Sequence, residues 1–568
     1  MSRDRLASLL TLALLATTVP ARPCHAQWHA NGARVCVAAN AQDHAQIIAD
    51  GSGGAIVTWQ DFRGGSSYDI YAQKLDSAGF PQWPDDGVPL CVADEDQEYP
   101  GIIADGAGGA IILWEDERDG NYDIYAQRIS AAGAPLWGPD GKPVCTDLSD
   151  QIHPTIAEDG AGGAIVTWED SRSGNGTALY VQRLNSNGAT QWQPGGVQLL
   201  AATGTGPRYP QVVSDDAQGG IVVWEEDRGS GWNVYARRVS AAGVPMWSST
   251  GSELTNAGAD QYYTTAVSDH VGGAIATWED GRSLASGWDI YAQRVDGDGV
   301  PQWSEDGVPL CTAQRAQEYP FLVADGTGGA IIAWYDYRAA TTSDIYAQWV
   351  NVAGVPQWTP DGVPLCAAER TQEDVALASD GAGGAIVSWY DLRSGTSSDI
   401  YAQGINAAGV QWPTPDGQAV CSDGGGQVSQ KIASDDAGGA IVAWVDYRNG
   451  NADIFAQRIY GSGAVAAAPP PTAPARFGLF APSPNPWRDG QLTIRFALPS
   501  SARVSAQVLD LTGHRLRVLV SEREFSAGTQ TLAWDGRNDS GVVLPAGVYF
   551  VHVQLGATSE TRRITLLR

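Results

Sequence analysis

Short apolar runs alternate along the chain with polar turns rich in glycine, and the whole pattern repeats at a fixed interval. In residues 53–63, two glycines precede an apolar run that ends at Trp59, and an acid and an arginine follow at Asp61 and Arg63. Equivalent tryptophans recur every 54 to 56 residues, at Trp114, Trp168, Trp224, Trp278, Trp334, Trp389 and Trp444. A period of this length indicates that each repeat is one supersecondary unit.

Each repeat contains four short segments that are predicted to be strands. In one copy they are residues 99–104, 110–114, 123–129 and 142–145, separated by turns of Gly, Asp and Pro. Segments of this length, rich in β-branched and aromatic residues, are typical of an antiparallel sheet. No segment shows a sustained helical period, so we expect an all-β array.

The two ends of the array predict how it closes. Residues 27–36 match residues 302–311, which form the fourth strand of a repeat, so the array begins with a fourth strand. The eighth copy stops after Arg458 and lacks that strand. The sequence therefore predicts an eight-bladed β-propeller over residues 27–460, closed when the N-terminal strand completes the last sheet.

Tryptophan, an acid and arginine are repeated in every copy, which favours a structural role because catalysis needs one asymmetric site. We expect each acid and arginine to fix a loop by an ion pair or by arginine–backbone hydrogen bonds. In the first three copies these residues are Trp59, Asp61, Arg63, Trp114, Asp116, Arg118, Trp168, Asp170 and Arg172. A second tryptophan column, beginning at Trp28 and Trp83, is predicted to fill space between sheets.

A ligand site is predicted where the copies differ. The residue before the third strand is aromatic in four copies, Tyr68, Tyr122, Trp232 and Trp288, and small in the others. Exposed rings beside carboxylates can stack on sugars or hold a peptide. The alternative, that each ring caps its own loop, stays open.

Enzyme chemistry finds little support in the sequence. The histidines of the mature chain, His29, His44, His153, His270, His514 and His552, share no repeat position in this interpretation. No nucleophile elbow, phosphate loop or zinc-protease motif is present. The glycine-rich turns offer too few oxygens for calcium, and we expect no metal and no cofactor. A binding or scaffold protein is favoured; the alternative is a secreted glycan-active hydrolase with its site in the propeller channel.

Charge and the N-terminus indicate where the protein works. The formal net charge is −29, and the excess of acids lies in the repeats, which argues against nucleic acid or anionic membrane surfaces as partners. Residues 1–26 read as a signal peptide, with cleavage after Ala26 or, alternatively, Ala21. No other stretch is long and apolar enough to span a bilayer. We expect a protein secreted to, or displayed on, a bacterial outer surface, with an extracellular glycan or protein as partner.

Six cysteines remain after cleavage, and all occupy the same repeat position. They are Cys36, Cys91, Cys145, Cys311, Cys366 and Cys421. Equivalent positions on neighbouring sheets lie roughly 10 Å apart, which is too far for a disulfide. The spacing predicts buried free thiols that act as small hydrophobic side chains.

The period ends in a linker of Pro, Ala and Gly at residues 461–475, and a small β-sandwich is expected over 476–568. Residues 483–487, 508–513, 534–541 and 545–550 carry a series of motifs, including Trp534-Asp535-Gly536, that is similar to the FlgD-like immunoglobulin domain. The series also marks the type A sorting domain of the type IX secretion system. The resemblance implies export through the outer membrane by that machinery. The repeats resemble bacterial exported β-propeller proteins that carry such tails.

Overall fold

The computed structural model describes Trp28 and residues 31–202, 206–283, 287–339, 342–461, 477–479, 482, 487, 492–498, 501–525, 528–556 and 558–567. Every regular element in these residues is a β-strand, and none is a helix that could cross a membrane. Residues 27–468 and 469–568 form separate compact units. The expected signal peptide and nearly all of the expected linker lie outside the described residues.

Eight four-stranded antiparallel sheets make up the first unit, numbered here in chain order. Sheet 1 is β2 (Gln42–Ala49), β3 (Ala55–Asp61), β4 (Asp69–Leu75) and β5 (Val88–Cys91). Sheet 2 is β6 (Gln97–Ala104), β7 (Ala110–Asp116), β8 (Asp123–Ile129) and β9 (Lys142–Cys145). Sheet 3 is β10 (Gln151–Glu158), β11 (Ala164–Asp170), β12 (Ala178–Leu184) and β13 (Val197–Leu200). Sheet 4 is β14 (Arg208–Ser214), β15 (Gly220–Asp227), β16 (Trp232–Val239) and β17 (Ser252–Glu253).

The remaining sheets follow the same order. Sheet 5 is β18 (Gln261–Ser268), β19 (Ala274–Asp280), β20 (Asp289–Val295) and β21 (Val308–Cys311). Sheet 6 is β22 (Gln317–Ala324), β23 (Ala330–Asp336), β24 (Asp344–Val350) and β25 (Val363–Cys366). Sheet 7 is β26 (Gln372–Ser379), β27 (Ala385–Asp391), β28 (Asp399–Ile405) and β29 (Gln418–Cys421). Sheet 8 is β30 (Gln427–Ser434), β31 (Ala440–Asp446), β32 (Asp453–Ile459) and β1 (Ala33–Cys36).

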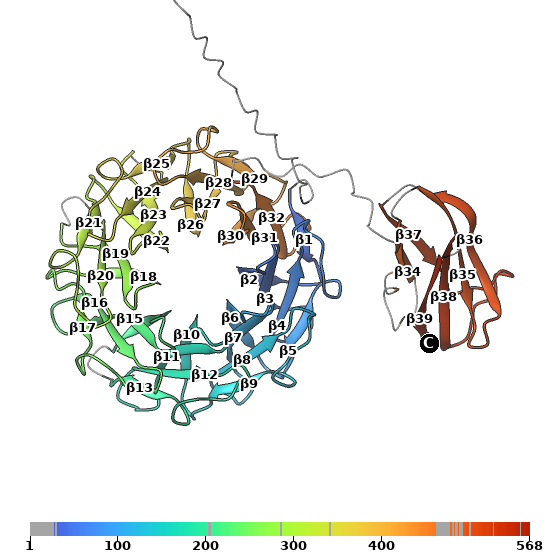
Figure 1. Cartoon of the computed structure of the whole chain (residues 1–568), viewed down its shortest axis with the longest axis horizontal. Coiled ribbons are helices and arrows are strands. Elements are labelled where there is room, and N and C mark those ends of the chain that lie inside the picture. Colours follow the sequence, from blue (N-terminus) through green and yellow to red (C-terminus); the bar gives the residue numbers. More distant parts are fainter. Residues whose placement is uncertain are drawn as a thin grey trace, which may run out of the picture. The chain divides into compact units, whose positions relative to one another are not determined.

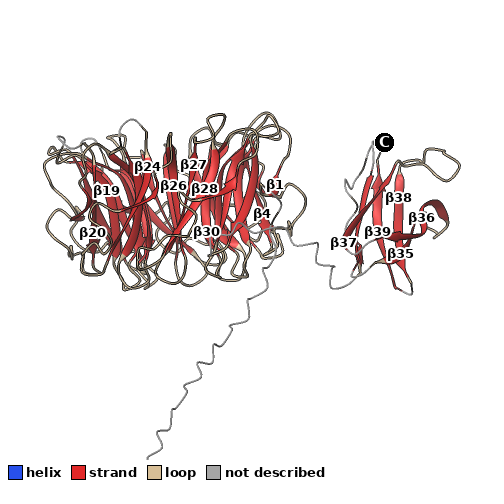
Figure 2. Cartoon of the chain, turned by 90° about the horizontal axis from the view of Figure 1, so that it is seen from above, coloured by secondary structure: helices blue, strands red, loops and turns tan. Residues whose placement is uncertain are grey.

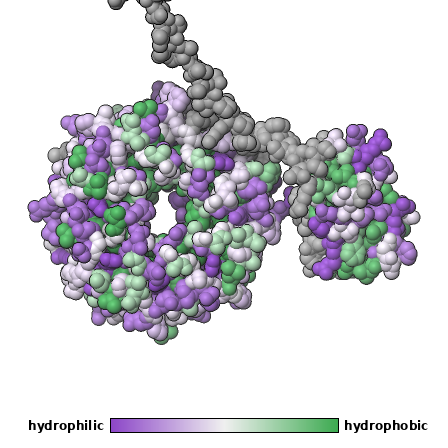
Figure 3. Space-filling model, viewed as in Figure 1, coloured by the Kyte–Doolittle hydropathy of each residue, from purple (hydrophilic) through white to green (hydrophobic). Residues whose placement is uncertain are grey.

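The sheets of the first unit stand around a central opening, with the first strand of each sheet innermost (Figure 1). Figure 3 shows that side chains leave this opening unfilled in that view. The second strand of each sheet is almost wholly buried; all seven residues of β3 are, for example. Both faces of such a strand are covered by neighbouring sheets, which explains the continuous apolar runs in the sequence.

The predicted pairing of the N-terminal strand with the last sheet is confirmed. Strand β1 pairs antiparallel with β32, in a register that sets Ala33 opposite Ala456. Strand β2 lies beside β30 and β31. One apolar cluster joins Trp28 and Val35 to Ile47 of sheet 1 and Ile441 of sheet 8. Residues from the two ends of the repeat region therefore share one core.

The repeated acid lies at the centre of a buried network in every sheet. In sheet 1, Asp61 accepts hydrogen bonds from the indole of Trp59 at 2.7 Å and from two nitrogens of Arg63 at 2.9 and 2.6 Å. The guanidinium of Arg63 also donates to the backbone oxygen of Asp86 and lies over the ring of Tyr71. The network thus ties the ends of the second and third strands to the loop before the fourth.

The cysteines complete this network. All six described thiols are free and buried, as predicted. The sequence interpretation took them for small apolar side chains, but the structure shows polar partners. The guanidinium of Arg63 lies 3.4 Å from the sulfur of Cys36, and five other arginine–cysteine pairs repeat this contact. Burial raises the pKa of each thiol, for example to about 12 for Cys91.

The second tryptophan column joins each sheet to the next. The indole of Trp83 in sheet 1 donates to the backbone oxygen of Ala131 in sheet 2, and its ring covers Gly133 so closely that a Cβ there would lie 2.6 Å away. The other seven indoles make the same bond, from Trp28, Trp137, Trp192, Trp247, Trp303, Trp358 and Trp412. We call these eight contacts the tryptophan latches.

The second unit contains two antiparallel sheets. One is β33 (Gly478–Leu479), β34 (Leu492–Leu498) and β37 (Gly528–Trp534). The other is β36 (Arg515–Phe525), β35 (Ala502–Leu509), β38 (Gly547–Leu555) and β39 (Thr558–Leu566). Their strands appear in red, without helices, in Figure 2. The core packs Trp487 against Trp534 and Phe496 against Phe525, as expected for a small sandwich.

Candidate functional site

A strained residue occurs at the same point of every inner strand. It is the third residue of the inner strand in seven sheets and the second residue of β14, and its φ lies between 50 and 58° in all eight sheets. We call these residues the collar: His44, Tyr99, His153, Tyr209, Tyr263, Tyr319, Asp374 and Ser429. A positive φ disfavours any side chain, and glycine normally fills such positions. Glycine occupies none of them here, although the chain has 68 glycines. Backbone strain of this kind concentrates at functional sites.

A β-bulge produces the strain. Pairing between the first two strands of sheet 2 runs from Glu98 opposite Glu115 to Gly101 opposite Leu113, so its register shifts across the collar residue. The bulge turns the collar N–H toward the neighbouring sheet, where a side chain accepts it. Tyr99 donates to Gln60 at 3.0 Å, His153 to Glu115 at 2.7 Å and Tyr319 to Glu279 at 2.6 Å. Bulges are known to redirect side chains beside active sites.

The collar side chains reach solvent and meet one another in pairs. Tyr99 and Tyr263 are each 51% exposed. The rings of His44 and Tyr99 lie 5.0 Å apart, those of His153 and Tyr209 5.1 Å, and those of Tyr263 and Tyr319 4.4 Å. The hydroxyls of the last pair are 3.3 Å apart. Six of the eight collar residues therefore present rings at one end of the inner strands.

Carboxylates lie beneath and beside these rings. Glu115, Glu169, Glu225 and Glu279 hold the same position, directly after the repeated tryptophan of sheets 2 to 5, and all are buried. Burial raises the pKa of Glu279 to about 8. Burial also raises the pKa of Glu115 and Glu225, while the carboxylate of Glu169 raises the pKa of His153. The exposed rings of the collar thus lie next to a group of buried carboxyl groups. Such a surface can bind aromatic rings and cations.

The predicted rim aromatics lie at the same end of the sheets, farther out. All four are half-buried. Trp232 and Trp288 both contact Tyr262, with ring centroids 6.5 and 5.4 Å apart, so the structure brings that pair into one cluster. Tyr68 packs on Phe62 of its own loop at 5.0 Å. Among the described ring contacts, none joins Tyr68 to Tyr122.

The structure corrects the prediction about histidines. His44 and His153 occupy equivalent positions in β2 and β10, so they do share a repeat position. Sequence reasoning also missed the collar tyrosines, Tyr99, Tyr209, Tyr263 and Tyr319. The available signal was a column, two residues after the glutamine that begins most inner strands, in which His and Tyr predominate.

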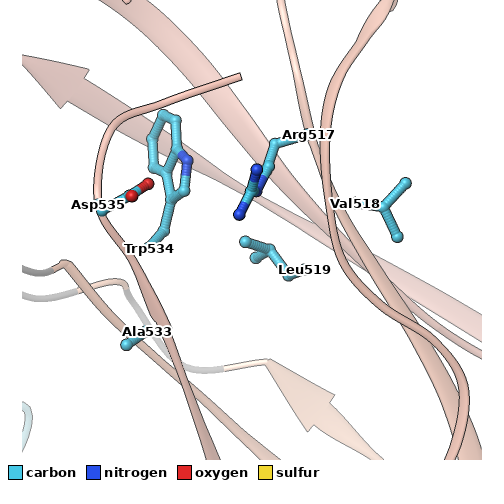
Figure 4. A pocket seen from close by; sticks show the side chains of 6 residues that line it. All are labelled: Arg517, Val518, Leu519, Ala533, Trp534 and Asp535. Carbon is cyan, nitrogen blue, oxygen red and sulfur yellow. The ribbon is translucent and has the colours of Figure 1, made fainter. Parts of the chain in front are cut away.

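The second unit has a shallow pocket of its own (Figure 4). Its lining residues are Arg517, Val518, Leu519, Ala533, Trp534 and Asp535. The guanidinium of Arg517 donates to the backbone oxygen of Asn538, and the indole of Trp534 donates to that of Arg537. These polar groups already serve the fold of the unit, so we place the candidate site at the collar.

Solved structures with a weak likeness to the chain come from several functional classes. The first is PorZ, a surface component of the type IX secretion system of Porphyromonas gingivalis, with 14% identity, a TM-score of 0.32, and coverage of 92% of this chain and 75% of that one. A PL25 ulvan lyase has 11% identity and a TM-score of 0.39, covering 76% and 95%. The endo-arabinase of Bacteroides thetaiotaomicron has 13% identity and a TM-score of 0.29, covering 59% and 99%. TM-scores this low carry no argument about fold or function.

The comparison of sequences is decisive for one part of the chain. None of the curated proteins matches the chain. The family model of the FlgD Ig-like domain, however, matches residues 485–559. The resemblance that the motifs around Trp534 and Asp535 predicted is thereby confirmed for the C-terminal region.

Proposed function

We propose that this chain is an exported binding protein built on a closed eight-bladed β-propeller. In this proposal the propeller spans residues 27–460, residues 1–26 are a cleaved signal peptide, 461–475 a linker, and 476–568 a sorting-like domain. Its place of action is the outer cell surface or the medium.

Closure of the ring is supported by contacts that continue without a break from sheet 8 to sheet 1. Trp28, which precedes β1 of sheet 8, donates to the backbone oxygen of Ser77 in sheet 1. Arg448 of sheet 8 donates to the backbone oxygen of Asn31. The same latch and the same arginine contact link other parts of the array, so the junction between its ends is built like the rest.

The collar carries the functional part of the proposal. Eight non-glycine residues held at positive φ, six of them His or Tyr, expose rings around one end of the inner strands. Each such residue costs about 1 kcal/mol or more of backbone strain. Rings are kept at six of the eight positions despite this strain, which supports a role of these side chains in recognition of an extracellular glycan or protein.

A binding screen tests this function. Residues 27–568 are applied to glycan and peptide arrays beside two double variants, Tyr263→Ala/Tyr319→Ala in the collar and Trp232→Ala/Trp288→Ala in the rim. We expect binding that the collar variant loses, and the rim variant shows whether the site extends outward. Absence of any binding, or equal binding by all three proteins, would refute the collar as the site. Progressive loss of glycan from the array would support the alternative, a glycan-active hydrolase.

Export by the type IX pathway is proposed from the C-terminal resemblance and the FlgD Ig-like match. In a bacterium that has this secretion system, the full chain should reach the outer surface or medium, and a chain ending at residue 475 should stay in the periplasm. Equal surface exposure of both chains would contradict this role of the C-terminal domain.

A further inference from the structure

One of the four buried glutamates beneath the collar differs from the other three in its partners. The ring nitrogen of His153 lies 2.9 Å from Glu169. The positive charge of protonated His153 also lowers the pKa of Glu115, against the effect of burial. The guanidinium of Arg208 lies 3.2 Å from Glu225. For Glu279, which is 3% exposed, the charged neighbours in the described part of the chain are the carboxylates of Glu318 and Glu225. Burying a carboxylate without a cation is unfavourable, and a ligand can remove that penalty.

The residue whose backbone binds this carboxyl group, Tyr319, belongs to a row of tyrosine rings. The backbone N–H of Tyr319 donates to Glu279, and the Tyr319 ring lies between those of Tyr263 at 4.4 Å and Tyr335 at 5.2 Å. Half-buried Glu318 pairs across the sheet with Tyr335 and adds a second acid. Electron-rich ring faces next to carboxylates are the surroundings that attract organic cations.

The neighbouring sheet shows how this surface holds a cation. The guanidinium carbon of Arg208 lies 3.5 Å from the ring centroid of Trp232 and 5.1 Å from that of Tyr262, while the same group reaches Glu225. Glu225 is as buried as Glu279, and its guanidinium partner comes from the adjacent strand of the same sheet.

In sheet 5, no described residue supplies the equivalent cation. In the strand register Tyr262 stands opposite Glu279 as Arg208 stands opposite Glu225. The side chain of Tyr262 instead contacts Trp232 and Trp288. Among the described residues, the carboxyl group of Glu279 therefore has no cationic partner like Arg208.

We propose that Tyr263, Tyr319, Glu279 and Glu318 form a site for the guanidinium of an arginine in a partner polypeptide. Arginine is favoured over lysine because its planar group stacks on aromatic rings and can bond two carboxylates at once. A neutral sugar offers no positive charge to Glu279 and Glu318, whereas a guanidinium offers one to both. This inference rests on the proposed binding function and specifies its ligand.

The test uses residues 27–568 and three fluorescent peptides that differ at one residue type: a Gly-Arg repeat, the same repeat with neutral citrulline, and the same repeat with lysine. We expect the arginine peptide to bind at least about tenfold more tightly than the other two, and added salt to weaken it. Equal binding of the citrulline peptide would overturn the inference, and equal binding of the lysine peptide would overturn the preference for guanidinium.

Variants locate the site. Glu279→Gln should weaken binding of the arginine peptide at least about tenfold, as should Tyr263→Ala/Tyr319→Ala. Glu305→Gln makes the same change of charge at an exposed position of sheet 5 outside the collar, and should change the affinity less than about twofold. Thermal melting curves show that each variant is folded. An unchanged affinity for Glu279→Gln would refute the site. Glycan binding at the collar without peptide binding would refute this inference and leave the proposed function standing.

Discussion

Two sets of positions recur in all eight sheets of the first unit, and they differ in what is kept. The buried network around Asp61 keeps tryptophan and arginine in every sheet, with glutamate replacing aspartate only at Glu226. The collar keeps a backbone conformation, and its side chains vary from tyrosine to serine. The first set is buried and the second is largely exposed.

The contrast has a physical origin. A buried carboxylate, guanidinium and indole satisfy one another only as a complete set, because removing one member leaves another buried without a partner. An exposed side chain on a strained backbone has no such constraint. Substitutions in the network should therefore affect folding. In our proposal, the varied side chains of the collar and the carboxyl group of Glu279 beneath them serve recognition.

The largest expected effect comes from removing the strand that joins the two ends of the array. Deletion of residues 27–40 takes Trp28 and Val35 from a shared core and exposes the edge of β32, so we expect a loss of about 5 kcal/mol or more in the free energy of unfolding. Thermal and urea unfolding measure it. Truncation after residue 468, which removes only the second unit, is the control and should leave the first unit's transition in place. Equal losses for the two deletions would contradict the closed ring.

A matched pair of glycines tests the latches. A Cβ at Gly133 would lie 2.6 Å from Trp83, whereas a Cβ at Gly106 meets nothing within 4 Å, and both residues have positive φ. Gly106→Ala should lower the free energy of unfolding by about 1 kcal/mol and Gly133→Ala by about 3 kcal/mol, since only the second adds overpacking to backbone strain. Urea titrations give both values, and equal effects would show that the latch contributes nothing.

The pH dependence of stability probes the carboxylate of Glu279. Its pKa is raised from 4.5 to about 8 in the folded chain, so the folded state keeps its proton while the unfolded chain releases it. The contribution of Glu279 to the free energy of unfolding is fully present below pH about 4.5 and is lost as the pH rises through about 8. Relative to Glu279→Gln, the unsubstituted chain should therefore lose about 4 kcal/mol between pH about 5 and about 9. The exposed variant Glu305→Gln should leave the dependence unchanged, and parallel curves for all three proteins would contradict the burial argument.

The smallest expected effect separates the collar's backbone from its side chain. At Tyr99, with φ of 52°, Tyr99→Gly relieves the strain and Tyr99→Ala keeps it. We expect the glycine variant to be about 1 kcal/mol more stable than the alanine variant, and neither to unfold the protein, because the side chain is half exposed. Chemical denaturation of both variants provides the comparison. A less stable glycine variant would mean that the side chain serves folding instead.

Sequence patterns alone determined the all-β class, the eight repeats, the free thiols and the pairing of the first strand with the last sheet. These features follow from the alternation of apolar runs with polar turns and from the fixed period. Each repeat has the residues that form the same strands and turns. The resemblance of the C-terminal region was also visible in its motifs.

Only the tertiary structure decided where the candidate site lies. The sequence pointed to Trp232 and Trp288, which do cluster, but it gave no reason to single out Tyr263, Tyr319 or Glu279. A positive φ at the collar arises from a bulge between two strands and from an acceptor on the next sheet. Among the described residues, the absence of a cation beside Glu279 depends on the directions of the Arg208 and Tyr262 side chains. Such features belong to contacts between sheets, and no local pattern encodes them.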